Sequence, residues 1–190
     1  LAIEDKLAAV ICIEDPVRPE AKEVISSLKE LGISKVVMMT GDSERTAKAI
    51  AGKVGVDEYY SEVLPEDKAS FVEKEKAAGR KVIMIGDGIN DSPALSAADV
   101  GIAISDGAQI AREIADITIS ADDLYQIVTL KLISDALMKK ISKNYKQIVG
   151  FNTGLIALGV AGVIQPATSA LLHNTSTLVI SLKSMQNLLT

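Results

Sequence analysis

An apolar run that leads directly into a turn rich in glycine and aspartate constrains the fold of this chain more than any other feature. The run Val-Ile-Met-Ile at residues 82–85 is followed by Gly-Asp-Gly-Ile-Asn-Asp-Ser-Pro-Ala-Leu at residues 86–95. A buried parallel strand of this kind delivers two carboxylates, Asp87 and Asp91, onto a turn whose glycines let the backbone approach a ligand. Carboxylate oxygens suit Mg²⁺, and Asn90 can hold a phosphate oxygen. We therefore expect a magnesium and phosphate site here, with an ordinary Gly-Asp-Gly turn as the alternative.

Short apolar runs alternate with helical patterns along the first two thirds of the chain. Runs rich in β-branched residues predict strands at residues 7–13, 35–39, 81–85, 100–104 and 117–119. Helical spacing with polar faces predicts helices at residues 19–31, 43–54, 65–78 and 108–114, and Ser-Pro at residues 92–93 begins another. This alternation is typical of an α/β fold with a parallel sheet, in which ligands bind beyond the carboxyl ends of the strands.

Charge divides the chain into two parts. All 25 acidic residues, and every basic residue except Lys183, precede residue 147, and the net charge is −5. Lysines and arginines alternate with acidic residues along the helical faces, which argues against a surface for nucleic acid. The single cysteine, Cys12, lies in an apolar run and is interpreted as a small buried side chain. Because the chain starts at Leu1 without a signal peptide, we expect the C-terminal piece of a longer polypeptide.

Two further polar groups follow the same edge of the predicted sheet. Thr40-Gly41-Asp42 comes after the strand at residues 35–39, where a hydroxyl and the N–H groups of a helix start can bind an anionic oxygen. A plain helix N-cap is the alternative. Lys68 lies on the first turn of a predicted helix, where its charge opposes the helix dipole unless an anion is near. The alternative for this residue is a solvated surface lysine.

The segment Asp-Pro-Val-Arg-Pro at residues 15–19 follows the first predicted strand. Two prolines around Arg18 make a stiff loop that can hold Asp15 and Arg18 in fixed positions. The same residues also suit an ordinary turn with a proline at the first helical position. The residues alone leave both interpretations of this loop open.

In this order and at these separations, four strings resemble the phosphorylation domain of P-type ATPases, in the haloacid-dehalogenase-like superfamily. They are Asp-Pro-Val-Arg-Pro-Glu, Met-Thr-Gly-Asp, Pro-Glu-Asp-Lys and Gly-Asp-Gly-Ile-Asn-Asp-Ser-Pro-Ala-Leu. The resemblance implies a haloacid-dehalogenase-like Rossmannoid parallel sheet that uses ATP and Mg²⁺. It assigns magnesium to Asp87 and Asp91, phosphoryl transfer to Thr40, Gly41, Asp42, Lys68 and Asn90, and nucleotide binding to Asp15, Arg18 and Asp42.

The chain departs from this family at the nucleophile. The family's nucleophile is the aspartate of an Asp-Lys-Thr-Gly-Thr string, and no such string occurs here. Asp15 follows an apolar run but is succeeded by Pro-Val-Arg, so we reject it as the nucleophile. The family's nucleotide-binding insertion and earlier membrane helices are absent as well. We therefore expect the nucleophile and these domains upstream in the same polypeptide, and no ATP hydrolysis by this chain alone.

The tail of the chain is apolar and uncharged from residue 147 to residue 182. One straight helix of that length would measure about 54 Å, well beyond the roughly 30 Å hydrocarbon core of a bilayer. Gln165-Pro166 is the natural break, which predicts a transmembrane hairpin with spans at residues 147–164 and 167–182. Both ends are predicted to be cytoplasmic because lysines flank them, at Lys139, Lys140, Lys143, Lys146 and Lys183. A buried hairpin in a soluble domain is the alternative.

Polar side chains interrupt the predicted spans. His173, Asn174 and Thr177 lie on the second span within two helical turns, and Asn152 lies on the first. Polar groups at membrane depth are costly, so we expect these four residues to bind the transported ion. Bonding between the helices is the alternative for Asn152. A hairpin with His-Asn-Thr-Ser-Thr in its last span resembles the heavy-metal branch of the P-type ATPases, with the metal left open.

The sequence is thus interpreted as the C-terminal part of an ATP-driven heavy-metal cation transporter, a multi-pass plasma-membrane protein whose catalytic domain is cytoplasmic. Its expected partners are ATP, a transition-metal cation, the lipid bilayer and the upstream domains. We expect a phosphorylation domain at residues 1–121, a stalk helix at 122–146 and the hairpin at 147–190. Two alternatives stay open: a phosphatase of the same superfamily, which an upstream Asp-x-Asp-x-Thr string would favour, and a truncated regulatory fragment without catalysis.

Overall fold

The computed structural model describes residues 2–3, 6–7, 16–87, 90–104, 113–120 and 123–188. The chain divides into two compact units, Leu1–Ile127 and Val128–Thr190, and each is described by itself. The first unit alternates strands and helices. In chain order these are β1 (Ala2–Ile3), β2 (Lys6–Leu7), α1 (Ala21–Glu30), β3 (Val37–Met39), α2 (Glu44–Val54), β4 (Glu58–Tyr60), α3 (Pro65–Ala77), β5 (Ile83–Gly86), α4 (Ser92–Ala97), β6 (Val100–Ile104) and β7 (Ile117–Ile119).

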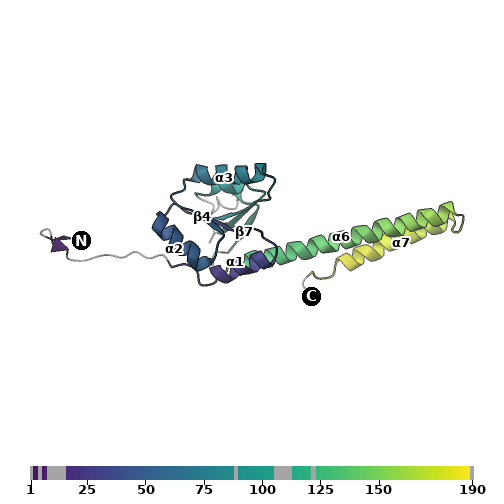
Figure 1. The fold of residues 1–190 in the computed structure, drawn as a ribbon. Coiled ribbons are helices and arrows are strands. Elements are labelled where there is room, and N and C mark those ends of the chain that lie inside the picture. The colour runs from purple at the N-terminus through teal and green to yellow at the C-terminus, as the bar shows by residue number, and fades with distance from the viewer. Residues whose placement is uncertain are drawn as a thin grey trace. The chain divides into compact units, whose positions relative to one another are not determined.

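The predicted α/β class with parallel strands is confirmed. β3 pairs with β4 in parallel, and β5, β6 and β7 form a second parallel sheet in that order. Figure 1 shows α3 on one side of the strands and α1 and α2 on the other. Among the described strands, β3 and β5 are not paired with each other, so the parallel strands form two sheets rather than one.

Two expected elements are described only in part, and one strand lies where none was expected. Of the strand expected at residues 7–13, only Leu7 is described, and it belongs to β2, which pairs antiparallel with β1. Of the helix expected at residues 108–114, only residues 113–114 are described, and they are helical. The strand β4 was not predicted, because it consists of only Glu-Tyr-Tyr and lacks an apolar run.

A small core joins the helices to both sheets. Val72 of α3, Met84 of β5 and Leu95 of α4 belong to one buried cluster, against which Met39 of β3 packs. Gly101 of β6 lets α4 come close, because a Cβ there would lie 2.7 Å from the carbonyl oxygen of Leu95. This packing places the ends of β3 and β5 near the first turns of α3 and α4.

The second unit is an antiparallel helical hairpin. Helix α6 (Tyr125–Val160) begins in the first unit, and α7 (Pro166–Ser184) returns beside it. Helix α6 ends earlier than the expected residue 164, because Gly162 adopts the left-handed conformation, with φ of 73°. The predicted break at Gln165-Pro166 is confirmed, with Pro166 as the first residue of α7. No boundary divides α6 at residue 146, where a stalk was expected to meet the membrane.

Hydrogen bonds from side chains of α6 join the two arms of the hairpin. Near its open end, Lys140 Nζ donates to the carbonyl oxygen of Gln186 at 2.5 Å. One turn further, Asn144 Nδ2 donates to Ser184 Oγ at 2.7 Å.

Within the described parts of the chain, no helix is both long enough and apolar enough to cross a membrane. The hairpin itself is confirmed, whereas the transmembrane character expected for it is not shown.

Candidate active site

The predicted phosphoryl-transfer residues gather where β3 and β5 end. Thr40 directly follows β3, and Asp87 directly follows β5. Lys68 lies on the first turn of α3, which begins at Pro65, and Asp91 is the N-cap residue of α4. β3 and β5 belong to different sheets, and among these residues the contact between distant parts of the sequence is that of Lys68 with Asp91.

Lys68 and Asp91 are in direct contact. Their Nζ and Oδ1 atoms lie 2.7 Å apart, and the side chains are 15% and 13% exposed. The Asp91 carboxylate lies over Gly86, since a Cβ at residue 86 would come within 2.4 Å of Asp91 Oδ2. The glycine at the end of β5 is therefore required for the close approach of this carboxylate.

A tight loop follows β3 and consists of Thr40, Gly41 and Asp42. Hydrogen bonds within the loop and from the segment after β4 hold it in place. Thr40 Oγ1 donates to Asp42 Oδ2 at 2.8 Å and accepts from the backbone N–H of Asp42 at 3.1 Å. The backbone N–H groups of Glu62 and Val63 donate to the carbonyl oxygens of Asp42 and Thr40, respectively. Asp42 does not cap α2, because the N-cap residue is Ser43. The plain-cap alternative for Asp42 is therefore wrong.

Glu44 supports the same loop, although no motif pointed to it. It lies on the first turn of α2 and accepts hydrogen bonds from Ser61 Oγ at 2.6 Å and Tyr59 Oη at 2.8 Å. These two bonds, first that of Ser61 and then that of Tyr59, hold the pKa of Glu44 below its ordinary value. The carboxylate thereby joins the start of α2 to β4, through Tyr59, and to Ser61, which follows that strand. An acidic residue in a first helical turn is too common to have indicated this role.

The remaining predicted residues of the first unit are exposed or lie outside the described residues. Asp87, Asn90 and Arg18 are exposed, and Arg18 lies just ahead of α1. Asp15 lies outside the described residues. Among the described histidines, cysteines and acidic residues, no group of three or more is placed to hold a metal ion. Mg²⁺ needs fewer protein ligands, because it is usually held by one or two carboxylates together with phosphate and water. The pair Asp87 and Asp91 fits that requirement.

In the hairpin, the structure brings together two of the four predicted ion ligands. His173 Nδ1 lies 2.8 Å from Asn152 Oδ1. An amide oxygen only accepts, so this bond requires the tautomer with the proton on Nδ1, in which Nε2 has a lone pair for a metal. The Thr177 hydroxyl donates to the carbonyl oxygen of His173 at 3.0 Å, and Asn174 is exposed. Asn152 therefore bonds the histidine ring, as its alternative role anticipated.

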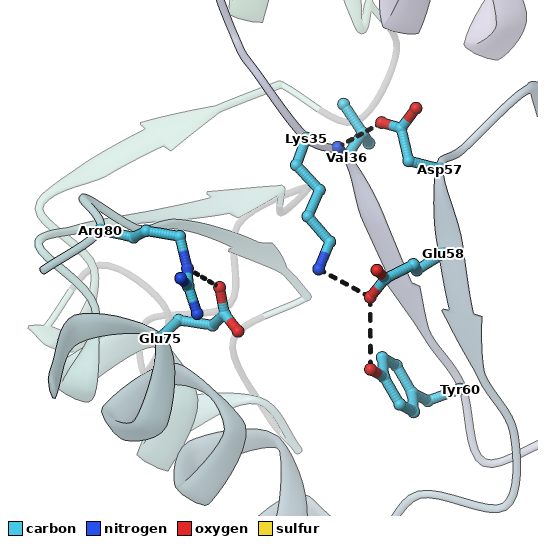
Figure 2. A network of polar contacts seen from close by, with 7 residues as sticks. All are labelled: Lys35, Val36, Asp57, Glu58, Tyr60, Glu75 and Arg80. Carbon is cyan, nitrogen blue, oxygen red and sulfur yellow. Dashed lines mark hydrogen bonds and ion pairs between the residues drawn. The ribbon is translucent and has the colours of Figure 1, made fainter. Parts of the chain in front are cut away.

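A polar network begins at the opposite, amino ends of the strands and extends to Tyr60, the last residue of β4 (Figure 2). Lys35, ahead of β3, pairs with Glu58 at 2.7 Å, and the Tyr60 hydroxyl donates to the same carboxylate oxygen at 3.3 Å. The hydrogen bond to Glu58 raises the pKa of Lys35. Arg80, ahead of β5, pairs with Glu75 of α3, which lowers the pKa of Glu75. The contacts of Glu58 stabilise the pairing of β3 with β4. The contact between Arg80 and Glu75 stabilises the C-terminal end of α3, which is the end away from Lys68.

Comparison with known sequences gives the family. The family described as haloacid dehalogenase-like hydrolase matches residues 1–99. Over 181 residues, 95% of this chain, the sequence is 39% identical to a zinc-exporting P-type ATPase of Mycobacterium marinum. Over 171 residues it is 46% identical to copper-transporting ATPase 2 of Rhizobium meliloti, and over 181 residues 38% identical to a manganese-exporting P-type ATPase of Mycobacterium bovis. The chain spans 25%, 20% and 25%, respectively, of the length of these relatives.

Solved structures agree with the sequence relatives. A zinc-transporting PIB-type ATPase in the E2.Pi state matches with a TM-score of 0.88 at 32% identity, over 98% of this chain and 30% of that one. The catalytic domain of the CPx-ATPase CopB-B matches with a TM-score of 0.55 at 39% identity, over 60% of this chain and 45% of that one. The chain therefore belongs to the haloacid dehalogenase-like hydrolases, and the proteins that it resembles over most of its length are heavy-metal P-type ATPases.

Proposed function

We propose that this chain is the C-terminal part of an ATP-driven transition-metal pump, which cycles through an aspartyl phosphate formed on an upstream aspartate. The observation that carries the proposal is the match to a zinc-transporting ATPase structure over 98% of the chain. That match includes both the α/β unit and the helical hairpin, so it covers more than the catalytic fold that phosphatases of the superfamily share. Zinc, copper and manganese transporters among the relatives leave the metal open.

The geometry at the sheet edge suits phosphoryl transfer. Lys68 and the Thr40 hydroxyl would hold phosphoryl oxygens, and Asn90 would orient the group. Asp87 and Asp91 would hold Mg²⁺, which when bound neutralises charge on the transferred phosphoryl group. Asp15, Arg18 and Asp42 would lie near the nucleotide. Phosphoryl transfer depends mainly on alignment and charge neutralisation, and this set of side chains supplies both.

The separation of the described parallel strands into two sheets supports a nucleophile on a strand from the upstream part of the polypeptide. Met39 at the end of β3 packs against the cluster that contains Met84 of β5, so the two sheets are neighbours although β3 and β5 are unpaired. A strand from the upstream part of the polypeptide, placed between β3 and β5, would pair with both. An aspartate at the carboxyl end of that strand would lie between Thr40 and Asp87. We place the phosphorylated aspartate there.

Exposed apolar side chains on the hairpin support a place in a membrane. Val160 is 85% exposed, Ile156 68%, Leu171 66% and Leu178 62%. Apolar surface of this extent requires a cover, and in the proposed pump lipid and the other membrane helices supply it. The pump would lie in the plasma membrane with its catalytic unit in the cytoplasm. His173 Nε2 would bind the transported ion, with Asn174 and Thr177 nearby and Asn152 fixing the ring.

Phosphorylation of the complete polypeptide from labelled ATP tests this function. We expect an acid-stable, hydroxylamine-sensitive phosphoenzyme that depends on Mg²⁺ and on a transition metal. Replacing Asp87 with Asn removes one charge with little change of shape, so labelling should fall by orders of magnitude while the fold survives. The control variant Glu66→Gln also removes one negative charge, from an exposed position on α3, and should leave labelling unchanged. Labelling of the 190-residue chain alone, or metal-independent hydrolysis of simple phosphate esters by the complete protein, would contradict the proposal.

A further inference from the structure

The second unit is positively charged, whereas the chain as a whole is acidic. Residues 128–190 hold six lysines and one aspartate, a net charge of +5, although the whole chain carries −5. The one aspartate, Asp135, is already paired with Lys131 at 2.5 Å. After Asp135 the sequence has no acidic residue, so the unit offers no further Asp or Glu side chain to its other five lysines. An anion from outside the unit would complement them.

Three of these lysines line one open groove. Lys139, Lys143 and Lys146 follow one another at spacings of four and three residues, which places them on one face of α6. Together with Met138, Ser142 and Gln147 they line a hollow of about 680 Å³. All three are exposed, and none takes part in an ion pair within the described part of the chain. Lys140, by contrast, is used to bind the end of α7.

The groove lies where α6 changes from charged to apolar. Lys146 is the last charged residue before Lys183, and the contact of Asn144 with Ser184 brings the C-terminal turn of α7, with Lys183, to this end of the hairpin. Tyr145, between the lysines, is 67% exposed, as is typical of aromatic side chains at a membrane surface. Next to the lysines, Met138 is 61% exposed and Ile141 50%. Cationic and apolar groups thus share one surface.

We propose that Lys139, Lys143 and Lys146 bind the phosphate headgroup of an acidic phospholipid, with its acyl chains against the apolar part of the hairpin. The inference rests on the proposed membrane location of the hairpin. A free phosphate ion would use the lysines but not the exposed apolar side chains beside them, whereas a phospholipid uses both. Each lysine near an anionic bilayer surface contributes about fivefold to binding, so three lysines produce a measurable preference for anionic over zwitterionic lipid.

The test compares lipid association in nanodiscs. The 190-residue chain is incorporated into discs of phosphatidylcholine and phosphatidylglycerol, and spin-labelled forms of each lipid report the relative association of the two headgroups with the protein. We expect a severalfold preference for phosphatidylglycerol. The triple variant Lys139→Gln, Lys143→Gln, Lys146→Gln should lose it. The control triple variant Lys22→Gln, Lys48→Gln, Lys53→Gln removes the same charge from exposed positions on α1 and α2 and should keep it.

Each other outcome has a distinct meaning. An unchanged preference in the groove variant, or an equal loss in both triple variants, would overturn the assignment of the groove. If millimolar inorganic phosphate competes and removes the preference, the ligand of the groove is a small anion and the assignment of a phospholipid is overturned. A chain that is incorporated into discs but shows no headgroup preference contradicts this inference alone. A chain that carbonate washing strips from the lipid contradicts the membrane location in the proposed function, and with it the inference.

Discussion

Lys68 on the first turn of α3 and Asp91 at the N-cap of α4 form an ion pair with 2.7 Å between Nζ and Oδ1. The same two helices supply Val72 and Leu95 to the core cluster, and both side chains of the pair are largely shielded from water. Each charge therefore fixes the position of the other. A phosphoryl group bound by Lys68 would change the electrostatic surroundings of Asp91, and a cation at Asp91 would change those of Lys68.

Replacing Lys68 with Met should destabilise the first unit. The substitution leaves the Asp91 carboxylate shielded but unpaired, which costs about 1–3 kcal/mol. Lys74→Met on the same helix, where the lysine is exposed, should change stability by less than about 0.5 kcal/mol. Urea unfolding of the 190-residue chain measures both values. Equal effects of the two substitutions would show that the pair makes no special contribution.

A methyl group at Gly86 should displace the Asp91 carboxylate. The added Cβ would lie 2.4 Å from Asp91 Oδ2 and 2.7 Å from its Cβ, so the aspartate must move and its bond to Lys68 weakens. We expect Gly86→Ala to lower the free energy of unfolding by about 1–3 kcal/mol. The matched control is Gly52→Ala in α2, where nothing lies within 4 Å of the added Cβ. That helix should instead be stabilised by roughly 0.5–1 kcal/mol, so the two alanine variants are expected to differ in sign.

The strands β3, β5, β6 and β7 could be predicted because local apolar patterns determine them, whereas β4 was missed. The apolar run before Gly86 forms β5, and Thr40 and Asp87 directly follow parallel strands as expected. The ion pair between Lys68 and Asp91 could not be predicted, because it depends on how α3 packs against α4. The early end of α6 depends on the left-handed backbone of Gly162. It could not be predicted, because the apolar tail contains several glycines and the sequence does not show which of them ends the helix.

The partner of His173 shows a similar limit. Helical spacing placed Asn174 and Thr177 near the histidine, but the side chain that lies within hydrogen-bond distance of its ring is Asn152 on the other helix. The Thr177 hydroxyl donates to the backbone of its own helix, which is a common arrangement for threonine in helices. Sequence spacing describes one helix at a time, whereas the contact depends on the register between two helices.

Acid should weaken the first unit through Asp57. This carboxylate accepts from Lys29 Nζ at 2.8 Å and from the backbone N–H of Val36 at 2.7 Å, and these bonds, in that order, lower its pKa. The folded state thus binds a proton less readily than the unfolded state, whose aspartates have a pKa of about 3.9. The stabilisation is complete above about pH 5 and is lost as the pH falls through the lower folded value.

Unfolding measured between about pH 2 and pH 7 checks this effect of Asp57. In Asp57→Asn the loss of stability below about pH 4 should be shallower than in the unmodified chain, because one group that takes up a proton on unfolding is gone. Glu66→Gln removes an exposed carboxylate on α3, so its loss of stability below about pH 4 should be nearly as steep as in the unmodified chain. Curves of the same steepness for the unmodified chain and Asp57→Asn would show that Asp57 does not contribute.

The bond between His173 and Asn152 makes the transport-site proposal testable in two steps. In the complete pump, His173→Ala should abolish metal-stimulated ATPase activity but leave phosphorylation by inorganic phosphate, which runs the cycle backwards, largely intact. Asn152→Leu removes the acceptor that holds the proton on Nδ1, so it should weaken metal activation by about 10- to 100-fold without abolishing it. Thr175→Val, which removes a hydroxyl that donates to the backbone carbonyl of Leu171 on its own helix, serves as the control.

The two substitutions separate metal binding from helix packing because they remove different atoms of one contact. If Nε2 of His173 binds the ion, losing the ring is more damaging than losing the amide that orients it, and the concentration of metal that gives half activation should rise in Asn152→Leu. If the contact only joins α6 to α7, both substitutions break the same bond. They should then lower stability to a similar extent and leave the metal dependence of phosphorylation unchanged, which would assign the ion site to other side chains.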